Sequence, residues 1–299
     1  MFNMKKFEPL CIKKRKVILD TDIGPDCDDV GAIALLNHWA DEFGFEISAI
    51  INCTSNRYGT ACIDAICTHF NRPDVLIGEY KPEGFHVKGL KYNKDIADNF
   101  PNKYLNGEKQ AWDSTALYEK VLSESEDDGV IIVTIGMLNT LWFAYERYPE
   151  LFERKVHAVI PMAAEYKTGR TYNIHCHVEA AKKFCEKYPG DVFFSGYELG
   201  VDVFTGFEIA DDNDPVNKAY GLFCGEPRIR KSWDLLTVMF AVFGTERNFG
   251  LTETGKIIVD NEGNNIFEAS ENGNHTFITA TVPKSDIEKE INAILRKNQ

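Results

Sequence analysis

Five aspartates stand within ten residues near the start of the chain, in the stretch V-I-L-D-T-D-I-G-P-D-C-D-D-V-G-A-I-A-L-L; they are Asp20, Asp22, Asp26, Asp28 and Asp29. Carboxylates this close repel one another, and burying them without partners costs several kcal/mol each. A helix N-terminus has too few free N–H groups to satisfy all of them. A hard cation is the better explanation, because calcium takes roughly 6–8 oxygen ligands.

The cluster follows a predicted strand, the apolar run Lys16–Asp22. Because side chains alternate along a strand, Asp20 and Asp22 point to the same side. In an open α/β sheet, ligands bind beyond the carboxyl ends of the strands, which is where the cluster lies. Its position therefore predicts a binding site.

The last two acids of the cluster, Asp28 and Asp29, open a predicted helix, where free N–H groups and the helix dipole favour negative charge. One residue, Cys27, separates Asp26 from this pair. The sequence leaves two roles open for it: Asp26 caps the helix, or it takes the place of Asp28 at the site.

Apolar runs alternate with amphipathic segments along the whole chain. The predicted strands are Lys16–Asp22, Phe45–Cys53, Val75–Glu79, Gly129–Ile135, Val156–Met162 and Asp191–Ser195. The predicted helices are Asp28–Ala40, Tyr58–Phe70, Ser114–Ser123, Leu138–Arg147, Val178–Lys187, Pro215–Leu222, Ser232–Phe243 and Lys284–Arg296. Continuous apolar strands are typical of a sheet with helices on both faces. The order predicts an α/β fold with a mostly parallel, doubly wound (Rossmann-like) sheet.

We expect one domain over residues 1–299, because no repeat or long linker divides the chain. Residues 1–15 are expected to form a flexible N-terminal arm. Turn signals at Asn261–Asn264 and Glu271–Asn274 predict a C-terminal β-hairpin region. Lys81–Gln110 has little periodicity and is interpreted as a lid or rim segment.

The composition limits the possible classes of protein. A net charge of −13 argues against a nucleic-acid-binding surface, which needs a basic stripe. No run approaches the ~20 apolar residues of a membrane span, and no signal-peptide core is recognisable. Eight cysteines without a C-x-x-C pair favour free thiols in a reducing compartment. We therefore expect a cytoplasmic protein that binds neither nucleic acid nor membranes.

A strand that ends in D-x-D resembles the haloacid-dehalogenase phosphatases, whose first Asp is a nucleophile and whose second is an acid/base. That family has Thr or Val two residues after the second Asp, where this chain has Gly24. Its separate acidic pair follows a strand, whereas Asp127 and Asp128 precede one. The fit is poor.

The stretch D-T-D-I-G-P-D-C-D-D-V-G-A more closely resembles the opening motif of the inosine–uridine nucleoside hydrolase family, D-x-D-x-G-x-D-D-x-x-A. This chain carries about two extra residues before the acidic pair, so aligning the helix start places that pair on Asp28 and Asp29. A gap-free alignment would use Asp26 and would put Cys27 at a metal-binding Asp. We prefer the first alignment.

Further elements of the family recur in order between about residues 16 and 243. A-I-I-N-C-T-S-N aligns Asn56 with a ribose-binding Asn, and T-I-G-M-L-N-T aligns Ile135 with a residue whose carbonyl binds calcium. M-A-A-E-Y-K-T-G-R-T-Y-N-I-H-C-H-V-E-A-A aligns Asn173 with a second ribose-binding Asn. S-W-D-L-L-T-V aligns Asp234 with a late Asp, preceded by Trp233.

The resemblance implies metal-dependent hydrolysis of the N-glycosidic bond of ribonucleosides, giving ribose and free base. Asp22 would be the base that activates a calcium-bound water. The implied calcium ligands are Asp22, Asp29, Asp234 and the carbonyl of Ile135, and the implied ribose ligands are Asp28, Asn56 and Asn173. The family further implies a homodimer or homotetramer and a role in nucleotide salvage.

Two departures from the family pattern bear on substrate and activity. Trp233 stands where many members have a His that is the suspected general acid; in the purine-preferring branch a Trp there stacks on the base, so we expect a leaning toward purines. Thr171 occupies the position of the family's ribose-binding Glu, and Glu165 is a candidate to make that ribose contact instead. The aromatic residues that could supply a second stacking face are Phe85, Tyr92, Phe100, Trp112 and Tyr172. These departures leave a degenerate nucleoside-binding protein without turnover as the alternative.

Overall fold

In the computed structural model, the described residues are 7–86 and 91–297. The twelve strands of the main sheet are β1 (Lys16–Thr21), β2 (Glu46–Asn52), β3 (Leu76–Glu79), β4 (Trp112–Asp113), β5 (Val130–Thr134), β6 (Val156–Pro161), β7 (Thr168–Gly169), β8 (Val192–Phe194), β11 (Phe249–Leu251), β12 (Gly255–Val259), β13 (Asn265–Ala269) and β14 (His275–Ala280). A second, antiparallel pair consists of β9 (Phe204–Phe207) and β10 (Arg228–Lys231).

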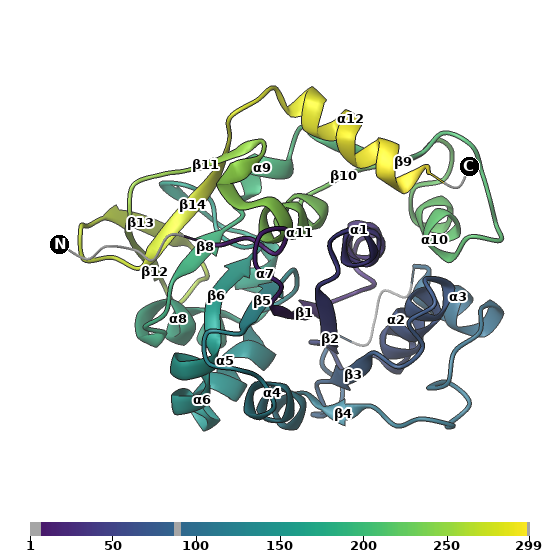
Figure 1. The fold of residues 1–299 in the computed structure, drawn as a ribbon, viewed down its shortest axis with the longest axis horizontal. Coiled ribbons are helices and arrows are strands. Elements are labelled where there is room, and N and C mark those ends of the chain that lie inside the picture. Colours follow the sequence, from purple (N-terminus) through teal and green to yellow (C-terminus); the bar gives the residue numbers. More distant parts are fainter. Residues whose placement is uncertain (1–6, 87–90, 298–299) are drawn as a thin grey trace.

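The helices alternate with the strands for most of the chain (Figure 1). They are α1 (Asp28–Phe43), α2 (Arg57–His69), α3 (Asn93–Asn99), α4 (Ser114–Ser123), α5 (Asn139–Arg147), α6 (Pro149–Lys155), α7 (Tyr172–His175), α8 (Val178–Lys187), α9 (Tyr197–Gly200), α10 (Pro215–Cys224), α11 (Asp234–Phe243) and α12 (Lys284–Leu295). No helix in the described part of the chain combines the length and the apolar character needed to cross a membrane.

The strand order of the main sheet is β4-β3-β2-β1-β5-β6-β8-β14-β12-β13-β7, with β11 paired to β14. The strands from β4 to β14 in this order are parallel. The remaining four strands, β12, β13, β7 and β11, are added through antiparallel pairs. The chain runs outward from β1 through β2 to β4 and then returns to β5 on the other side of β1. The carboxyl end of β1 is therefore a topological switch point, where open α/β sheets bind ligands.

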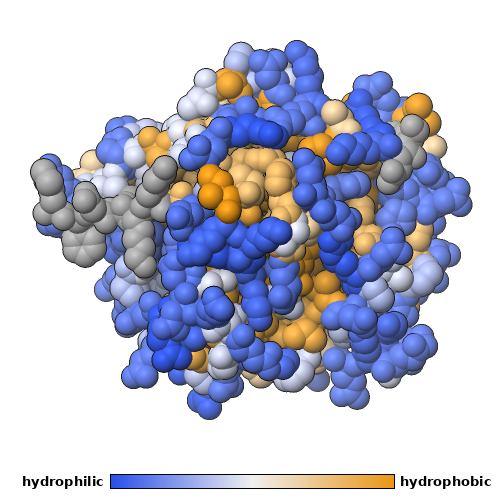
Figure 2. Space-filling view, in the orientation of Figure 1, coloured by the Kyte–Doolittle hydropathy of each residue, from blue (hydrophilic) through white to orange (hydrophobic). Residues whose placement is uncertain are grey.

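Helices cover both faces of the sheet and create two apolar cores. Val17 and Leu19 of β1 belong to the core beneath α1 and α11, whereas Ile18, pointing the other way, belongs to the core beneath α4 and α5. This alternation explains why β1 has no polar face: both of its sides are buried. Hydrophilic side chains cover most of the outer face seen in Figure 2, with hydrophobic residues visible in patches between them.

The α/β fold and its mostly parallel sheet confirm the fold class predicted from the sequence, and each predicted strand and helix is present with ends shifted by at most a few residues. One hairpin is also confirmed, β12–β13 with its turn at 260–264. The turn at Glu271–Asn274 does not close a second hairpin, because β14 pairs with β8 and β12 and not with β13.

Two segments predicted to be irregular contain ordered structure. Lys81–Gln110 includes α3, although residues 87–90 within it lie outside the described residues. Of the expected N-terminal arm, residues 1–6 also lie outside them, whereas Phe7 and Leu10 are buried in the same core as α11. The backbone N–H of Leu10 donates to the carbonyl of Ala241 at 3.1 Å.

Candidate active site at the carboxyl end of β1

A cavity of about 330 Å³ lies at the carboxyl end of β1, beside the starts of α1 and α11. Small-molecule sites usually occupy roughly 300–1,000 Å³, so the cavity is large enough for a compact ligand. The sequence-predicted site residues that line it are Asp22, Asp28, Asp29, Ile135, Asn173, Trp233 and Asp234. The fold brings these residues together although Asp22 and Asp234 are more than two hundred positions apart in the chain.

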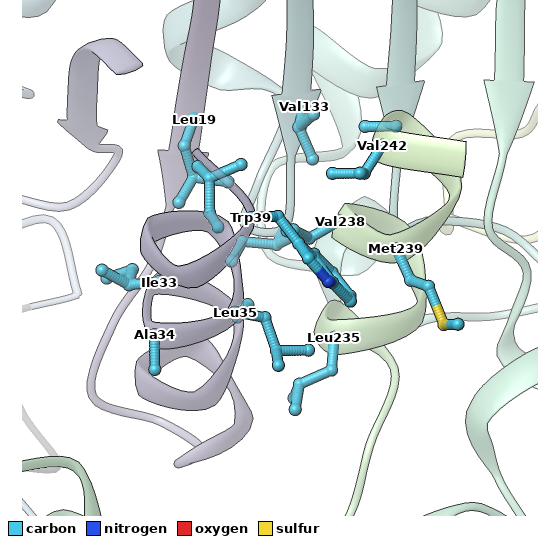
Figure 3. Close-up of a cluster of buried hydrophobic side chains, with 14 of the residues drawn as sticks. Leu19, Ile33, Ala34, Leu35, Trp39, Val133, Leu235, Val238, Met239 and Val242 are labelled. Atoms are coloured by element: carbon cyan, nitrogen blue, oxygen red, sulfur yellow. The ribbon is translucent and has the colours of Figure 1, made fainter. Parts of the chain in front are cut away.

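Two helices packed side by side hold most of the acids. Leu35 and Trp39 of α1 face Leu235 and Val238 of α11 in the apolar layer between them (Figure 3). Every residue of α11 is buried. Because both helices begin at the cavity, the partial positive charge of each N-terminus lies near the carboxylates.

Asp28 joins the two helix starts. Its Oδ2 accepts hydrogen bonds from the backbone N–H groups of Trp233 at 2.9 Å and Asp234 at 3.2 Å. Asp28 thus caps the start of α11 although it belongs to α1. Its neighbour Asp29 accepts a short hydrogen bond from the hydroxyl of Thr21, the last residue of β1. These contacts fix β1, α1 and α11 relative to one another.

Three carboxylates form a candidate metal centre. Asp28, Asp29 and Asp234 each offer an oxygen, and these oxygens lie within 4.8 Å of one another. Burial raises the pKa of all three, to about 7 for Asp28, and neighbouring carboxylates raise each pKa further. A hard divalent cation fits this donor set, because it takes oxygen ligands and offsets the mutual repulsion.

Asp22 lies beside this group, directly after β1, and also lines the cavity. Burial raises its pKa to about 7, and its charge in turn raises the pKa of Asp29. Gly136 explains how the loop after β5 can approach so closely: a Cβ there would lie 2.5 Å from the backbone nitrogen of Asp22. The three carboxylates that converge thus include Asp28, which the family resemblance assigns to the ribose. Asp22, which the resemblance assigns to calcium, lies beside them.

Asp26, whose role the sequence left open, neither caps α1 nor replaces Asp28. The N-cap of α1 is Cys27, which makes no side-chain cap bond. The carboxylate of Asp26 instead forms an ion pair with Arg230 of β10, and its backbone carbonyl accepts a hydrogen bond from Tyr92 at 2.6 Å. The two extra residues before the acidic pair therefore place the carboxylate of Asp26 on the wall of the cavity.

Asn173 fixes the opposite wall. Its Nδ2 donates to the carbonyl of Ile135 at 3.0 Å and to that of Met162 at 2.9 Å. A carbonyl oxygen has two lone pairs, so the Ile135 oxygen can accept this bond and also bind a cation. Nearby, the hydroxyl of Thr171 accepts from the N–H of Ala164, a residue held in the left-handed region at φ +65°.

Aromatic side chains form the remaining wall. Trp233 stacks on Tyr197 with ring centroids 5.6 Å apart, and its indole N–H donates to the Tyr197 carbonyl at 2.7 Å. Tyr172 lines the cavity as well and is about half exposed. Of the five candidates for a second stacking face, Tyr172 alone lines the cavity among the described residues. Tyr92 is instead buried beneath Asp26.

Two predicted substrate-binding residues do not line the cavity in the described part of the chain. Asn56 is the N-cap of α2, where its side chain accepts from the N–H of Tyr58 at 3.0 Å. Glu165 is anchored through its backbone to Asn265, and its side chain packs against Gly169. Their assignment to the ribose stays a prediction.

Among the site residues that the sequence did not predict are Arg170, Tyr197, Arg230 and Gly136. The first three line the cavity, and the fourth makes room for Asp22. Gly136 stood within the quoted T-I-G-M motif, so its lack of a side chain was a usable signal. Arg170 also stood within a quoted motif, M-A-A-E-Y-K-T-G-R-T-Y-N, but at a position to which the family assigns no role. Tyr197 and Arg230 lie outside the quoted motifs, and Arg230 meets Asp26 across 204 positions of sequence.

Comparisons with known proteins place the fold. No family model matches the sequence, and no curated protein matches it significantly. An inosine-guanosine nucleoside hydrolase matches in structure with a TM-score of 0.74 and 18% identity, over 94% of this chain and 98% of that one. A purine-preferring ribonucleoside hydrolase from Gardnerella vaginalis matches with a TM-score of 0.72 and 16% identity, over 95% and 100%.

The fold is also shared with a protein of another kind. The type III effector protein XopQ, solved in complex with adenosine diphosphate ribose, matches with a TM-score of 0.69 and 14% identity, over 95% of this chain and 92% of that one. The chain therefore has the nucleoside hydrolase fold over nearly its whole length, as the sequence motifs predicted. At these identities the likeness defines the fold, and the chemistry has to be argued from the site.

Proposed function

We propose that this protein is a calcium-dependent ribonucleoside hydrolase that cleaves purine ribonucleosides into ribose and free base. The observation that carries the proposal is the convergence of Asp28, Asp29 and Asp234 beside Asp22 at the switch point of this fold. A structural explanation would require basic partners for these buried acids. Asp26 has one in Arg230, but no ion pair is found for the other four among the described residues.

The cation would be held by Asp29, Asp234 and the Ile135 carbonyl, together with Asp22, Asp28 or both. When bound, calcium lowers the pKa of a coordinated water and offers open positions to the ribose 2′- and 3′-hydroxyls. A 2′-deoxyribonucleoside lacks one of these hydroxyls. We therefore expect ribonucleosides to be preferred.

The chain's own groups carry the reaction. Asp22 takes a proton from the attacking water, whose oxygen bonds to C1′ of ribose while the bond from C1′ to the base nitrogen breaks. The electron pair of that bond leaves with the base, which takes up a proton. The carboxylates around the ribose stabilise the positive charge that develops on the sugar in an oxocarbenium-like transition state.

Trp233 supports the purine preference. Its ring lines the cavity beside the start of α11, so a flat base that enters above the acids meets an aromatic surface. Stacking on this ring favours the protonated form of a departing purine through a cation–π attraction of roughly 0.5–2 kcal/mol. Asn173, and in our proposal Asn56 and Glu165, hold the ribose.

A nucleoside-binding protein without turnover is the second candidate. The observation that favours it is the absence of the family's ribose-binding Glu, replaced by Thr171, whose hydroxyl is occupied by the Ala164 N–H. The structure of the type III effector protein XopQ in complex with adenosine diphosphate ribose supports this candidate, because the same fold there holds a ribose compound.

The test is a hydrolysis assay with inosine, uridine and 2′-deoxyinosine, with calcium or with chelator, in which free base and reducing sugar are measured. We expect calcium-dependent release from inosine and loss of release in Asp22→Asn. The matched control is Asp127→Asn, which changes an exposed acid far from the cavity. Saturable inosine binding without turnover in the wild-type protein would favour the binding protein, and phosphate release from a nucleotide would favour a phosphatase.

Further properties are proposed from the family resemblance: a cytoplasmic location, a role in nucleotide salvage and a homodimeric or homotetrameric state. The phosphatase interpretation has little support from geometry. Asp127 and Asp128, its candidate second acidic pair, directly precede β5 and thus lie at the amino end of the sheet, away from Asp22.

A further inference from the structure

An ion pair lies on the cavity wall and has no part in the hydrolysis described above. Arg230 Nε donates to Asp26 Oδ1 at 2.9 Å, and Arg230 Nη2 donates to Asp26 Oδ2 at 2.5 Å. The acid is held in place because Tyr92, which is buried, donates its hydroxyl to the Asp26 carbonyl. Both partners of the pair line the cavity.

The pair leaves one edge of the guanidinium available. A guanidinium carries five N–H donors in a planar fork. Asp26 occupies the side formed by Nε and Nη2, and Nη1 has no hydrogen-bond partner among the described residues. The end of the fork, with one N–H from Nη1 and one from Nη2, can therefore still donate two parallel hydrogen bonds to a ligand.

The free edge of the Arg230 guanidinium lies close to the aromatic residues proposed to contact the purine base. The Cζ of Arg230 lies 5.8 Å from the centroid of the Trp233 ring and 5.5 Å from that of Phe223. The guanidinium lies over the Trp233 ring, on which Tyr197 also stacks, and all three residues line the cavity, so a flat base bound beside this aromatic pair has one edge near the guanidinium. The ligand group that suits two parallel N–H donors is a pair of adjacent acceptors.

We propose that Arg230, oriented by Asp26, binds the O6 and N7 atoms of a 6-oxopurine, and that the substrates are 6-oxopurine ribonucleosides. The inference rests on the proposed hydrolase function and narrows its substrate. Arginine pairs with the O6 and N7 acceptors of guanine through the same bidentate geometry, whereas adenine offers an N6 amino donor beside N7. Pyrimidines have no N7.

The same contact assists departure of the base. As the bond to C1′ breaks, electron density moves onto the purine ring, and two N–H donors at O6 and N7 stabilise it; the proton that the base takes up is then added at a ring nitrogen other than N7. Asp26 partly neutralises the guanidinium, which reduces its attraction to the nearby Asp28 and leaves its free edge for the ligand. The insertion before Asp28 thus supplies the residue that orients the base-recognising arginine.

The proposal predicts a substrate order that needs no mutation. In the wild-type protein we expect kcat/KM for inosine to exceed that for adenosine and for 7-deazainosine, each by about 10–100-fold, because each analogue disrupts one acceptor of the pair. Equal values for inosine and 7-deazainosine would overturn the assignment. If no ribonucleoside is hydrolysed at all, the hydrolase proposal itself fails, and the two failures are therefore distinguishable.

Variants of Arg230 and Asp26 test whether this arginine causes the expected preference for inosine. Arg230→Gln and Arg230→Lys should both lose the preference for inosine over adenosine, because an ammonium cannot reproduce the planar fork. Asp26→Asn should weaken the preference less, since the arginine remains but its orientation is looser. Arg247→Gln, which removes an arginine that pairs with Glu290 at the surface, is the matched control and should keep the order. An unchanged inosine preference in folded Arg230→Gln, or a stronger dependence on Arg230 for inosine 5′-monophosphate than for inosine, would overturn the proposal.

Discussion

Charged side chains are paired at the amino end of β1, whereas four acids at its carboxyl end lack ion-pair partners in the described part of the chain. At the amino end, Arg15 is buried, yet its guanidinium donates to the carboxylates of Glu8 and Asp128 at 2.9 and 3.0 Å. His157 also bonds to Asp128 at 2.9 Å. At the carboxyl end, Asp22, Asp28, Asp29 and Asp234 gather without an ion-pair partner among the described residues.

The pKa directions express the same difference. Although burial opposes it, hydrogen bonds from His157 and Arg15 hold the pKa of Asp128 below its usual value. At the other end, burial raises the pKa of Asp22 to about 7. The acids at the amino end thus have cationic partners from the chain, whereas in our proposal the acids at the carboxyl end bind a cation from solution; perturbed pKa values of this kind cluster at functional sites. This contrast, more than the number of acids, marks the carboxyl end as functional.

The largest expected effect is on catalysis at the carboxyl end. Asp22→Asn should lower kcat by about 10²–10⁴-fold, because the proton acceptor for water is lost. The urea midpoint in metal-free buffer should not fall, since the change removes a charge from a repulsive group. A loss of stability without a loss of turnover would mean that Asp22 is a structural acid like Asp128.

The converse change is expected at the amino end. Asp128→Asn should lower the free energy of unfolding by about 1.5–3 kcal/mol, because buried Arg15 loses one of its charged partners. Turnover per folded molecule should stay close to wild type. Urea unfolding and an assay on the same preparation measure both quantities, and lost turnover in a folded variant would contradict the division between the two ends.

The pH dependence should also differ in sign between the two ends. Between about pH 4 and pH 7, folded Asp22 and Asp28 retain protons that the unfolded chain has released, so they lower stability as pH rises. Asp128 stabilises the fold above about pH 4 and loses that contribution at lower pH. Calcium should therefore raise Tm more at pH 8 than at pH 5. Equal shifts at both pH values would argue against a cation among these carboxylates.

The smallest expected effect concerns backbone strain near the site. Ala164 has φ +65°, where glycine has no steric cost, so Ala164→Gly should stabilise the protein by roughly 1 kcal/mol. The neighbouring residue Ala163 is buried without positive φ, and Ala163→Gly should destabilise the protein instead. Urea unfolding of the two variants would show the opposite signs, and a destabilised Ala164→Gly would mean that the methyl group's packing outweighs the strain.

The local pattern around β1 predicted much of the fold and part of the site. An apolar run followed by acids at a helix start depends on short-range rules, so β1, α1 and the position of the cavity could be inferred. Asp234 could be placed only through the order of family motifs, since nothing near it in sequence shows that α11 packs against α1.

The remaining parts depend on contacts between distant segments. Asp26 had no readable role because its partner, Arg230, lies on a short strand with no pattern of its own. Asn56 matched a ribose-binding position, yet its side chain caps α2, a role that a turn-forming residue before a helix can equally have. The prediction of a second hairpin was wrong because β12 lies between β13 and β14 in the sheet and pairs with both.

The capping of α11 by Asp28 has a consequence for assembly of the protein. The carboxylate group exists only after residues from the first and the last third of the chain have met, so no short fragment can reproduce it. Calcium affinity should accordingly appear late in refolding, together with packing of α11 against α1. The ion would then act as a reporter of the completed tertiary structure, in contrast to cations bound by a single contiguous loop.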